Sequence, residues 1–173
     1  RQAYIGENFQ IGQSRVILEP RTLAKLLDAL DIHKDELVLD IGTGLGYSSA
    51  IISLIAEAVI AVEDDSNLAT EAEEILSDIG ADNVVVQVSK LEDGAPEHGP
   101  YDVVILQGGI EEIPESISKQ LKNGGRVGAI FVEKGLGTAK IGFKLNDKIN
   151  WRYAFNAAAP VLPGFFKQKD FAL

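Results

Sequence analysis

The sequence contains no cysteine, no methionine and only two histidines among its 173 residues. Without cysteine there is no disulfide, no thiolate nucleophile and no cysteine-ligated metal. His33 and His98 lie far apart and lack the spacing typical of metal ligands, so we expect no metal site. Because position 1 is not methionine either, we expect that the N-terminus is truncated and the chain is a fragment or lacks its true start.

The chain is also poor in basic residues and in long apolar runs. Sixteen Lys and Arg against 26 Asp and Glu give a net charge of −10. This charge repels a phosphate backbone, so we expect no nucleic-acid partner. No apolar run reaches the roughly 18 residues that a membrane span requires, and no signal peptide is visible. We therefore expect a cytoplasmic protein with no membrane partner.

What the sequence does contain is a glycine-rich turn between an apolar strand and a helix. Residues 37–47 read LVLDIGTGLGY, with glycines at 42, 44 and 46. Glycine adopts positive φ at low cost, and the free N–H groups of the following helix start face the turn. Twenty-one residues after Gly42, a second apolar run ends at Glu63, where a carboxylate can accept hydrogen bonds from a ribose diol. The pattern predicts a pocket for a nucleoside-containing cofactor.

The spacing of the glycines distinguishes two kinds of cofactor. Dinucleotide-binding folds have G-x-G-x-x-G, and their turn cradles a pyrophosphate. Here the order is G-x-G-x-G preceded by Asp40, and an acidic residue suits a cofactor with a cationic amino-acid end and no phosphate. The segment resembles the first motif of class I S-adenosylmethionine-dependent methyltransferases, so we expect S-adenosylmethionine as cofactor. A tight strand-to-helix turn without a ligand is the alternative interpretation.

Alternating apolar strands and amphipathic helices predict an α/β fold. Strands are expected at residues 37–41, 58–62, 84–88, 102–106 and 126–132, and helices at residues 20–30, 46–56, 66–79 and 113–121, the last ending at 123–125. Residues 138–145 and 148–156 flank Asn146-Asp147, which favours a β-hairpin. We therefore expect a single domain over residues 1–173: a Rossmann-like methyltransferase sandwich with a seven-stranded, mostly parallel sheet and a C-terminal antiparallel hairpin that puts one antiparallel strand at the end. Residues 1–19 give no clear assignment.

A more specific likeness lies further along the chain. The run DGAPEHGPYD at residues 93–102, together with IGTGLGY at 41–47 and QLKNGGR at 120–126, resembles the protein-L-isoaspartate O-methyltransferase family. The resemblance covers roughly residues 12–132. It implies methyl transfer from S-adenosylmethionine to the carboxylate of an abnormal isoaspartyl residue, with a protein or small-molecule methyl acceptor as partner.

Two positions depart from the family pattern. The family carries a serine beside the methyl-transfer site, two residues before the proline that opens the first helix, and this chain has Leu18 there. The family's G-D-G after the third strand corresponds to Ser89, Lys90 and Leu91, so that a basic residue replaces the acid. Leucine cannot donate a hydrogen bond to an acceptor carboxylate. We therefore expect an O-methyltransferase that keeps the cofactor and has changed its acceptor.

Other functions stay open at this point. Isoaspartyl methylation could be retained despite the two changes. A non-catalytic protein that binds S-adenosylmethionine or S-adenosylhomocysteine is an alternative, and an NAD-dependent oxidoreductase is a further one. Phe165 and Phe166 near the C-terminus would suit a contact in a homodimer.

The expected cofactor contacts gather at the carboxyl ends of the strands. Asp40 would accept from the cofactor's amino group and Glu63 from its ribose, while Gln107 lies where acceptors meet the methyl group. Asp40 could instead cap a backbone turn, Tyr47 could pack in the core, and Gln107 could simply end a strand. Few catalytic side chains are expected, since a carboxylate acceptor is already anionic, and which residues are catalytic stays unknown from the sequence. The expected cofactor-binding residues are Asp40, Gly42, Thr43, Gly44, Gly46, Tyr47, Glu63, Asp64, Ser89, Lys90, Leu91 and Gln107.

Overall fold

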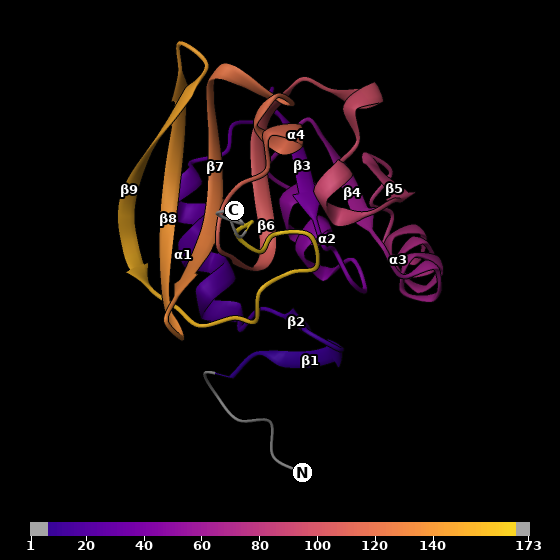
Figure 1. The fold of residues 1–173 in the computed structure, drawn as a ribbon. Helices are drawn as coiled ribbons and strands as arrows, with labels where there is room; N and C mark the ends of the chain where they lie inside the picture. The colour runs from indigo at the N-terminus through magenta and orange to yellow at the C-terminus, as the bar shows by residue number, and fades with distance from the viewer. Residues whose placement is uncertain (1–6, 169–173) are drawn as a thin grey trace.

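The structure is a computed structural model that describes residues 7–168. A seven-stranded sheet in the order β5-β4-β3-β6-β7-β8-β9 forms its centre (Figure 1). The strands are β3 (Leu37–Ile41), β4 (Ala58–Glu63), β5 (Val84–Val88), β6 (Tyr101–Ile110), β7 (Leu121–Glu133), β8 (Leu136–Leu145) and β9 (Lys148–Asn156). The first five run parallel to one another, as the alternating pattern predicts.

The C-terminal hairpin is formed by β8 and β9. Asn146 and Asp147 form its turn with φ of 51° and 62°, the left-handed conformation that two-residue hairpin turns need. β8 pairs antiparallel with both β7 and β9. Among the described strands of this sheet, the one that runs against the rest is therefore β8, the next to last, and β9 again runs parallel to the first five. The mostly parallel sheet with an antiparallel hairpin is confirmed, but the expectation of an antiparallel strand at the end was wrong, because β8 lies between β7 and β9 and pairs antiparallel with both.

The helices follow the predicted pattern with two differences. They are α1 (Pro20–Leu30), α2 (Tyr47–Ser53), α3 (Ser66–Asp78) and α4 (Glu115–Ser118), with short 3₁₀ turns at Leu91–Asp93 and Pro96–His98. α2 is shorter than the predicted 46–56. The helix expected to end at residues 123–125 ends at Ser118 instead. Gly124 and Gly125 lie inside β7, because this strand already begins at Leu121, which pairs with Tyr101 of β6. The buried Lys144 also donates to the carbonyl oxygens of Ser118 and Leu121, each at 2.7 Å.

Two apolar clusters cover the two faces of the sheet. On one face, Leu26 and Leu30 of α1 pack with Ile52 of α2 against the strands. On the other, the segment after β9 crosses the sheet and buries Leu162 and Phe165 (Figure 1). Phe165 is 0% exposed, so the homodimer contact expected there was wrong for this residue, because its ring completes the chain's own core. Its neighbour Phe166 is exposed.

The first nineteen residues, which gave no assignment, contain a small hairpin. β1 (Phe9–Gly12) pairs antiparallel with β2 (Arg15–Ile17), and Ser14 in the turn has φ of 58°. Figure 1 shows this hairpin at the foot of the molecule, outside the main sheet. It lies at the carboxyl ends of the parallel strands, since Arg15 contacts Glu63, the last residue of β4.

Candidate cofactor site

The glycine-rich turn joins the end of β3 to the start of α2. Its backbone is tied to the neighbouring strand, because the N–H groups of Gly42 and Thr43 donate to the carbonyl of Val62 at 2.8 and 3.1 Å. Gly44 has φ of 60° and Gly46 has φ of 88°, so both adopt a conformation that glycine takes at little cost. The predicted strand, turn and helix are thus formed as expected.

Asp40 lies beneath this turn and is 0% exposed. One carboxylate oxygen accepts from the hydroxyls of Ser48 and Ser49, each at 2.6 Å, and the other accepts from Nε2 of Gln107 at 2.8 Å. Burial raises the pKa of Asp40, and these hydrogen bonds oppose the rise. The structure therefore brings Asp40 and Gln107 together. The two serines were missed by sequence reasoning, although they occupy the first turn of the helix that the glycines introduce.

Glu63 is also 0% exposed, and its partners are different. Arg15 holds it through two parallel bonds, from Nη2 to Oε1 at 2.6 Å and from Nη1 to Oε2 at 2.9 Å. The N–H of Gly44 donates to Oε1 at 2.8 Å, and the N–H of Asp65 donates to Oε2 at 2.9 Å. Burial alone would raise the pKa of Glu63, but hydrogen bonds and the Arg15 charge lower it to about 2.

Asp64 shares the same arginine. Its Oδ1 accepts from Nη1 of Arg15 at 2.6 Å, and its side chain is 32% exposed, whereas that of Arg15 is 6% exposed. Burial and the adjacent Glu63 raise the pKa of Asp64. Arg15 was missed by sequence reasoning, because one arginine in an unassigned segment carries no periodic signal.

The other predicted residues lie at different depths. Thr43 is buried, with its hydroxyl 2.9 Å from that of Ser49. Ser89 lies beside the end of β4, where its N–H donates to the carbonyl of Glu63 at 3.2 Å. Lys90 is exposed. Leu91 is fully buried in the core, because it begins a 3₁₀ turn that packs onto the sheet.

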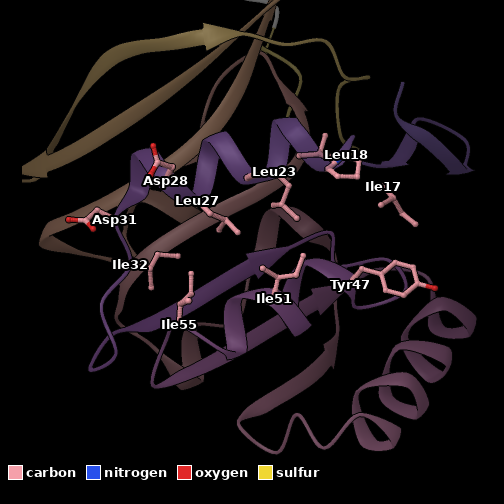
Figure 2. Close-up of a pocket in the computed structure, with 12 residues that line it drawn as sticks. Ile17, Leu18, Leu23, Leu27, Asp28, Asp31, Ile32, Tyr47, Ile51 and Ile55 are labelled. Carbon is pink, nitrogen blue, oxygen red and sulfur yellow. The ribbon is translucent and has the colours of Figure 1, made fainter. Parts of the chain in front are cut away.

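An apolar groove of about 650 Å³ runs between α1 and α2. In Figure 2 the leucines of the α1 side face Tyr47 and Ile51 of α2, while Asp28 and Asp31 lie at one end. These two aspartates are the only charged residues that line the groove in the described part of the chain. Leu18 lines both this groove and a smaller cavity against the glycine turn, so the groove leads toward the turn.

The residue types suit an adenosine-containing cofactor, but among the described residues the β1–β2 hairpin lies close against the glycine turn. A Cβ built on Gly44 would lie 2.7 Å from Cδ1 of Ile11, and one on Gly42 would lie 3.4 Å from Nη2 of Arg15. The remaining cavity at the turn measures about 30 Å³, room for about one or two water molecules. The hairpin therefore occupies the face of the turn that a cofactor would need.

The described residues place two limits on the site. Within residues 7–168, the structure contains no group of at least three His, Asp or Glu side chains that could hold a metal ion. Over the same residues, none of the helices has the length and apolar character to cross a membrane.

The fold is that of the class I methyltransferases. The structure superposes on a precorrin-6y C5,15-methyltransferase from Geobacter metallireducens GS-15 with a TM-score of 0.61 and 17% identity, covering 86% of this chain and 89% of the other. A protein-L-isoaspartate O-methyltransferase structure gives a TM-score of 0.82 at 26% identity, covering 90% and 51%. A Plasmodium falciparum structure, described as a candidate member of that family in complex with S-adenosyl-L-homocysteine, gives 0.75 at 21% identity, covering 92% and 81%.

The sequence comparisons narrow this class to one family. The family model for protein-L-isoaspartate(D-aspartate) O-methyltransferase (PCMT) matches residues 1–150. The chain belongs to this family. It is 36% identical over 126 residues to the protein-L-isoaspartate O-methyltransferase of Syntrophus aciditrophicus (strain SB), which is 73% of this chain and 58% of that protein. The Brucella anthropi enzyme is 38% identical over 125 residues, 72% and 58% of the two lengths. The matched part thus spans less than two thirds of these relatives.

Proposed function

We propose that the chain is an S-adenosylmethionine-dependent methyltransferase. The observation that carries this proposal is the pair of buried carboxylates, Asp40 and Glu63, at the carboxyl ends of neighbouring parallel strands on either side of the glycine turn. Family membership supports the same conclusion. When bound, the cofactor supplies a methyl group on a sulfonium together with its own leaving group.

The residues of this chain would bind and orient the cofactor. Asp40, held in place by Ser48, Ser49 and Gln107, would accept hydrogen bonds at the amino-acid end. Glu63 would accept hydrogen bonds from the ribose hydroxyls if Arg15 moved away from it. Apolar walls around the turn would exclude water from the reacting groups, and alignment of acceptor and methyl donor supplies most of the acceleration in such a displacement.

In our proposal, the methyl acceptor is not the isoaspartyl carboxylate. It is a different O-methyl acceptor with an apolar body, either a protein or a small molecule. Leu18 is buried and lines the groove where the family has a serine, so no hydroxyl meets a carboxylate at that position. Asp28 and Asp31 are acidic, and they would repel an anionic acceptor at the open end of the groove. Burying a carboxylate without a partner is costly.

A methyl-transfer assay with labelled S-adenosylmethionine and an isoaspartyl peptide tests this assignment. We expect the parent chain to turn over more slowly than about 1 per second, the lower end of ordinary enzyme rates. Leu18→Ser should raise turnover of this peptide, whereas the matched change Leu23→Ser, in the same groove, should not. Fast turnover by the parent would show that the serine is dispensable and that the acceptor is unchanged.

The same samples distinguish the remaining alternatives. Tight binding of S-adenosylmethionine without transfer to any acceptor tried would favour the non-catalytic binding protein. A preference for NAD over S-adenosylmethionine would favour the oxidoreductase, although the G-x-G-x-G spacing and membership of a methyltransferase family oppose it.

A further inference from the structure

The N-terminal hairpin covers the glycine turn and contacts it through two side chains. Ile11 of β1 packs on Gly44, close to where a side chain on that glycine would lie. Arg15 of β2 reaches past Gly42 to the carboxylate of Glu63. The two contacts are of different kinds, one apolar and one ionic, and both cover the surface that an adenosine-containing ligand would use.

Glu63 has no bonding position left for a ribose diol. Each carboxylate oxygen has two lone pairs, and each accepts one bond from Arg15 and one from a backbone N–H. The N–H groups of Gly44 and Asp65 belong to the turn and to the chain directly after β4, so they are fixed in place. Arg15 comes from a separate element, and its guanidinium is the one donor group that can leave without disturbing the main sheet.

Arg15 has a second partner outside the buried site. Nη1 is already 2.6 Å from Oδ1 of the partly exposed Asp64, so the arginine could swing outward and remain paired. We call the position of Arg15 over Glu63 the seated position. In this position one donor group of the guanidinium, the buried Nε, lacks a hydrogen-bond partner among the described residues. An unpaired buried donor carries a free-energy cost, which disfavours the position that Arg15 occupies over Glu63.

We propose, on the basis of the proposed function, that Arg15 competes with the ribose of the cofactor for the carboxylate of Glu63. The cofactor then binds only when the β1–β2 hairpin moves away from the glycine turn, a state called lifted. The apparent dissociation constant is then the intrinsic constant divided by the fraction of molecules with a lifted hairpin. By the same linkage, bound cofactor must disfavour the seated hairpin.

Calorimetric titration with S-adenosylhomocysteine tests the competition in Arg15→Gln. Removing the guanidinium should tighten binding by about tenfold or more if the lifted fraction is about one tenth or less. Arg126→Gln is the matched control, because Arg126 makes an equally bidentate pair with Glu36, at 2.7 and 2.9 Å, away from the turn. Its affinity should stay within about twofold of the parent. Circular dichroism would verify that each variant is folded.

Two further samples keep the test decisive. Ile11→Ala leaves the Arg15–Glu63 pair intact, so if Arg15→Gln fails to fold, Ile11→Ala should still tighten binding by loosening the hairpin. 5′-Methylthioadenosine retains the ribose but lacks the amino-acid end, and it should show the same gain in Arg15→Gln as S-adenosylhomocysteine.

The outcomes separate the inference from the function on which it rests. If the parent binds S-adenosylhomocysteine and Arg15→Gln binds it equally or more weakly, Arg15 is not a competitor and the proposed function stands. If neither the parent nor the loosened variants bind S-adenosylmethionine or S-adenosylhomocysteine, the cofactor assignment falls and the inference falls with it.

Discussion

Asp40 and Glu63 are both buried acids near the carboxyl ends of neighbouring parallel strands, yet their partners differ in kind. Asp40 accepts from neutral hydroxyl and amide groups, and burial raises its pKa. Glu63 is held by a guanidinium, and the Arg15 charge together with the hydrogen bonds to its carboxylate lowers its pKa to about 2 despite burial. In our proposal, β3, α2 and β6 of the main sheet and its helices supply the residues for the amino-acid half of the cofactor. The residue proposed for the ribose half is instead held by an arginine of a separate hairpin.

The largest expected difference concerns stability. Glu63→Gln leaves Arg15 buried without its main counter-charge, which should lower the free energy of unfolding by about 3–5 kcal/mol. Asp40→Asn removes only one charge among neutral donors that can reorient, and it should cost about 1 kcal/mol. Urea unfolding followed by circular dichroism at pH 7 measures both.

The double variant Arg15→Gln/Glu63→Gln serves as the control for this comparison. Because it removes both charges, it should recover much of the stability lost in Glu63→Gln. Equal costs for Glu63→Gln and Asp40→Asn would show that the ion pair contributes nothing beyond ordinary hydrogen bonding.

The second expected difference between Glu63 and Asp40 is how their contributions to stability change at acidic pH. The folded pKa of Glu63, about 2, lies below its ordinary value of 4.5, so the pair stabilises the fold above pH 4.5 and loses this contribution as the pH falls toward 2. Because Arg15 supplies only part of this shift, the stability advantage of the parent over Arg15→Gln at pH 7 should be at most about 3 kcal/mol. It should shrink steadily below pH 4.5, as urea unfolding at a series of pH values would show. An advantage that is the same at pH 7 and pH 2.5 would contradict the assigned partner. Asp40, with its raised pKa, has the opposite sign, so Asp40→Asn should not converge on the parent in this way.

The smallest expected effect concerns the apolar contact of the hairpin. Gly44 and Gly80 both have positive φ, of 60° and 74°, so alanine at either position should cost about 1 kcal/mol. A Cβ at Gly44 would meet Ile11, whereas a Cβ at Gly80 would meet no heavy atom of the described residues within 4 Å. Gly44→Ala should therefore cost about 1 kcal/mol more than Gly80→Ala in thermal or urea unfolding. Equal costs would mean that Ile11 moves aside freely.

Periodic and turn-based features of the fold could be read from the sequence. The leucines of α1, the apolar strands and the Asn146-Asp147 turn each carry a local signal that the structure confirms. The junction of α4 and β7 could not be predicted, because pairing of Leu121 with Tyr101 overrides the local helical pattern. The β1–β2 hairpin has strands of only four and three residues, too short for a periodic pattern.

The candidate site was also predictable only in part, because some of its contacts depend on the tertiary fold and carry no local sequence signal. The glycine turn and the positions of Asp40 and Glu63 follow from strand ends, which the sequence indicates directly. What holds Glu63 does not, because Arg15 lies 48 residues earlier and reaches it only through the tertiary fold. The burial of Leu91 could not be predicted either, because it depends on the 3₁₀ turn that follows β5.

The most direct measurement is amide hydrogen exchange of the unmodified chain with and without saturating S-adenosylhomocysteine. If Arg15 competes with the ribose for Glu63, the amides of residues 9–17 should exchange faster when the ligand is bound, while those of α1 stay unchanged. Slower exchange in residues 9–17 would show that the hairpin closes on the ligand as part of its site, and would contradict the competition between Arg15 and the cofactor.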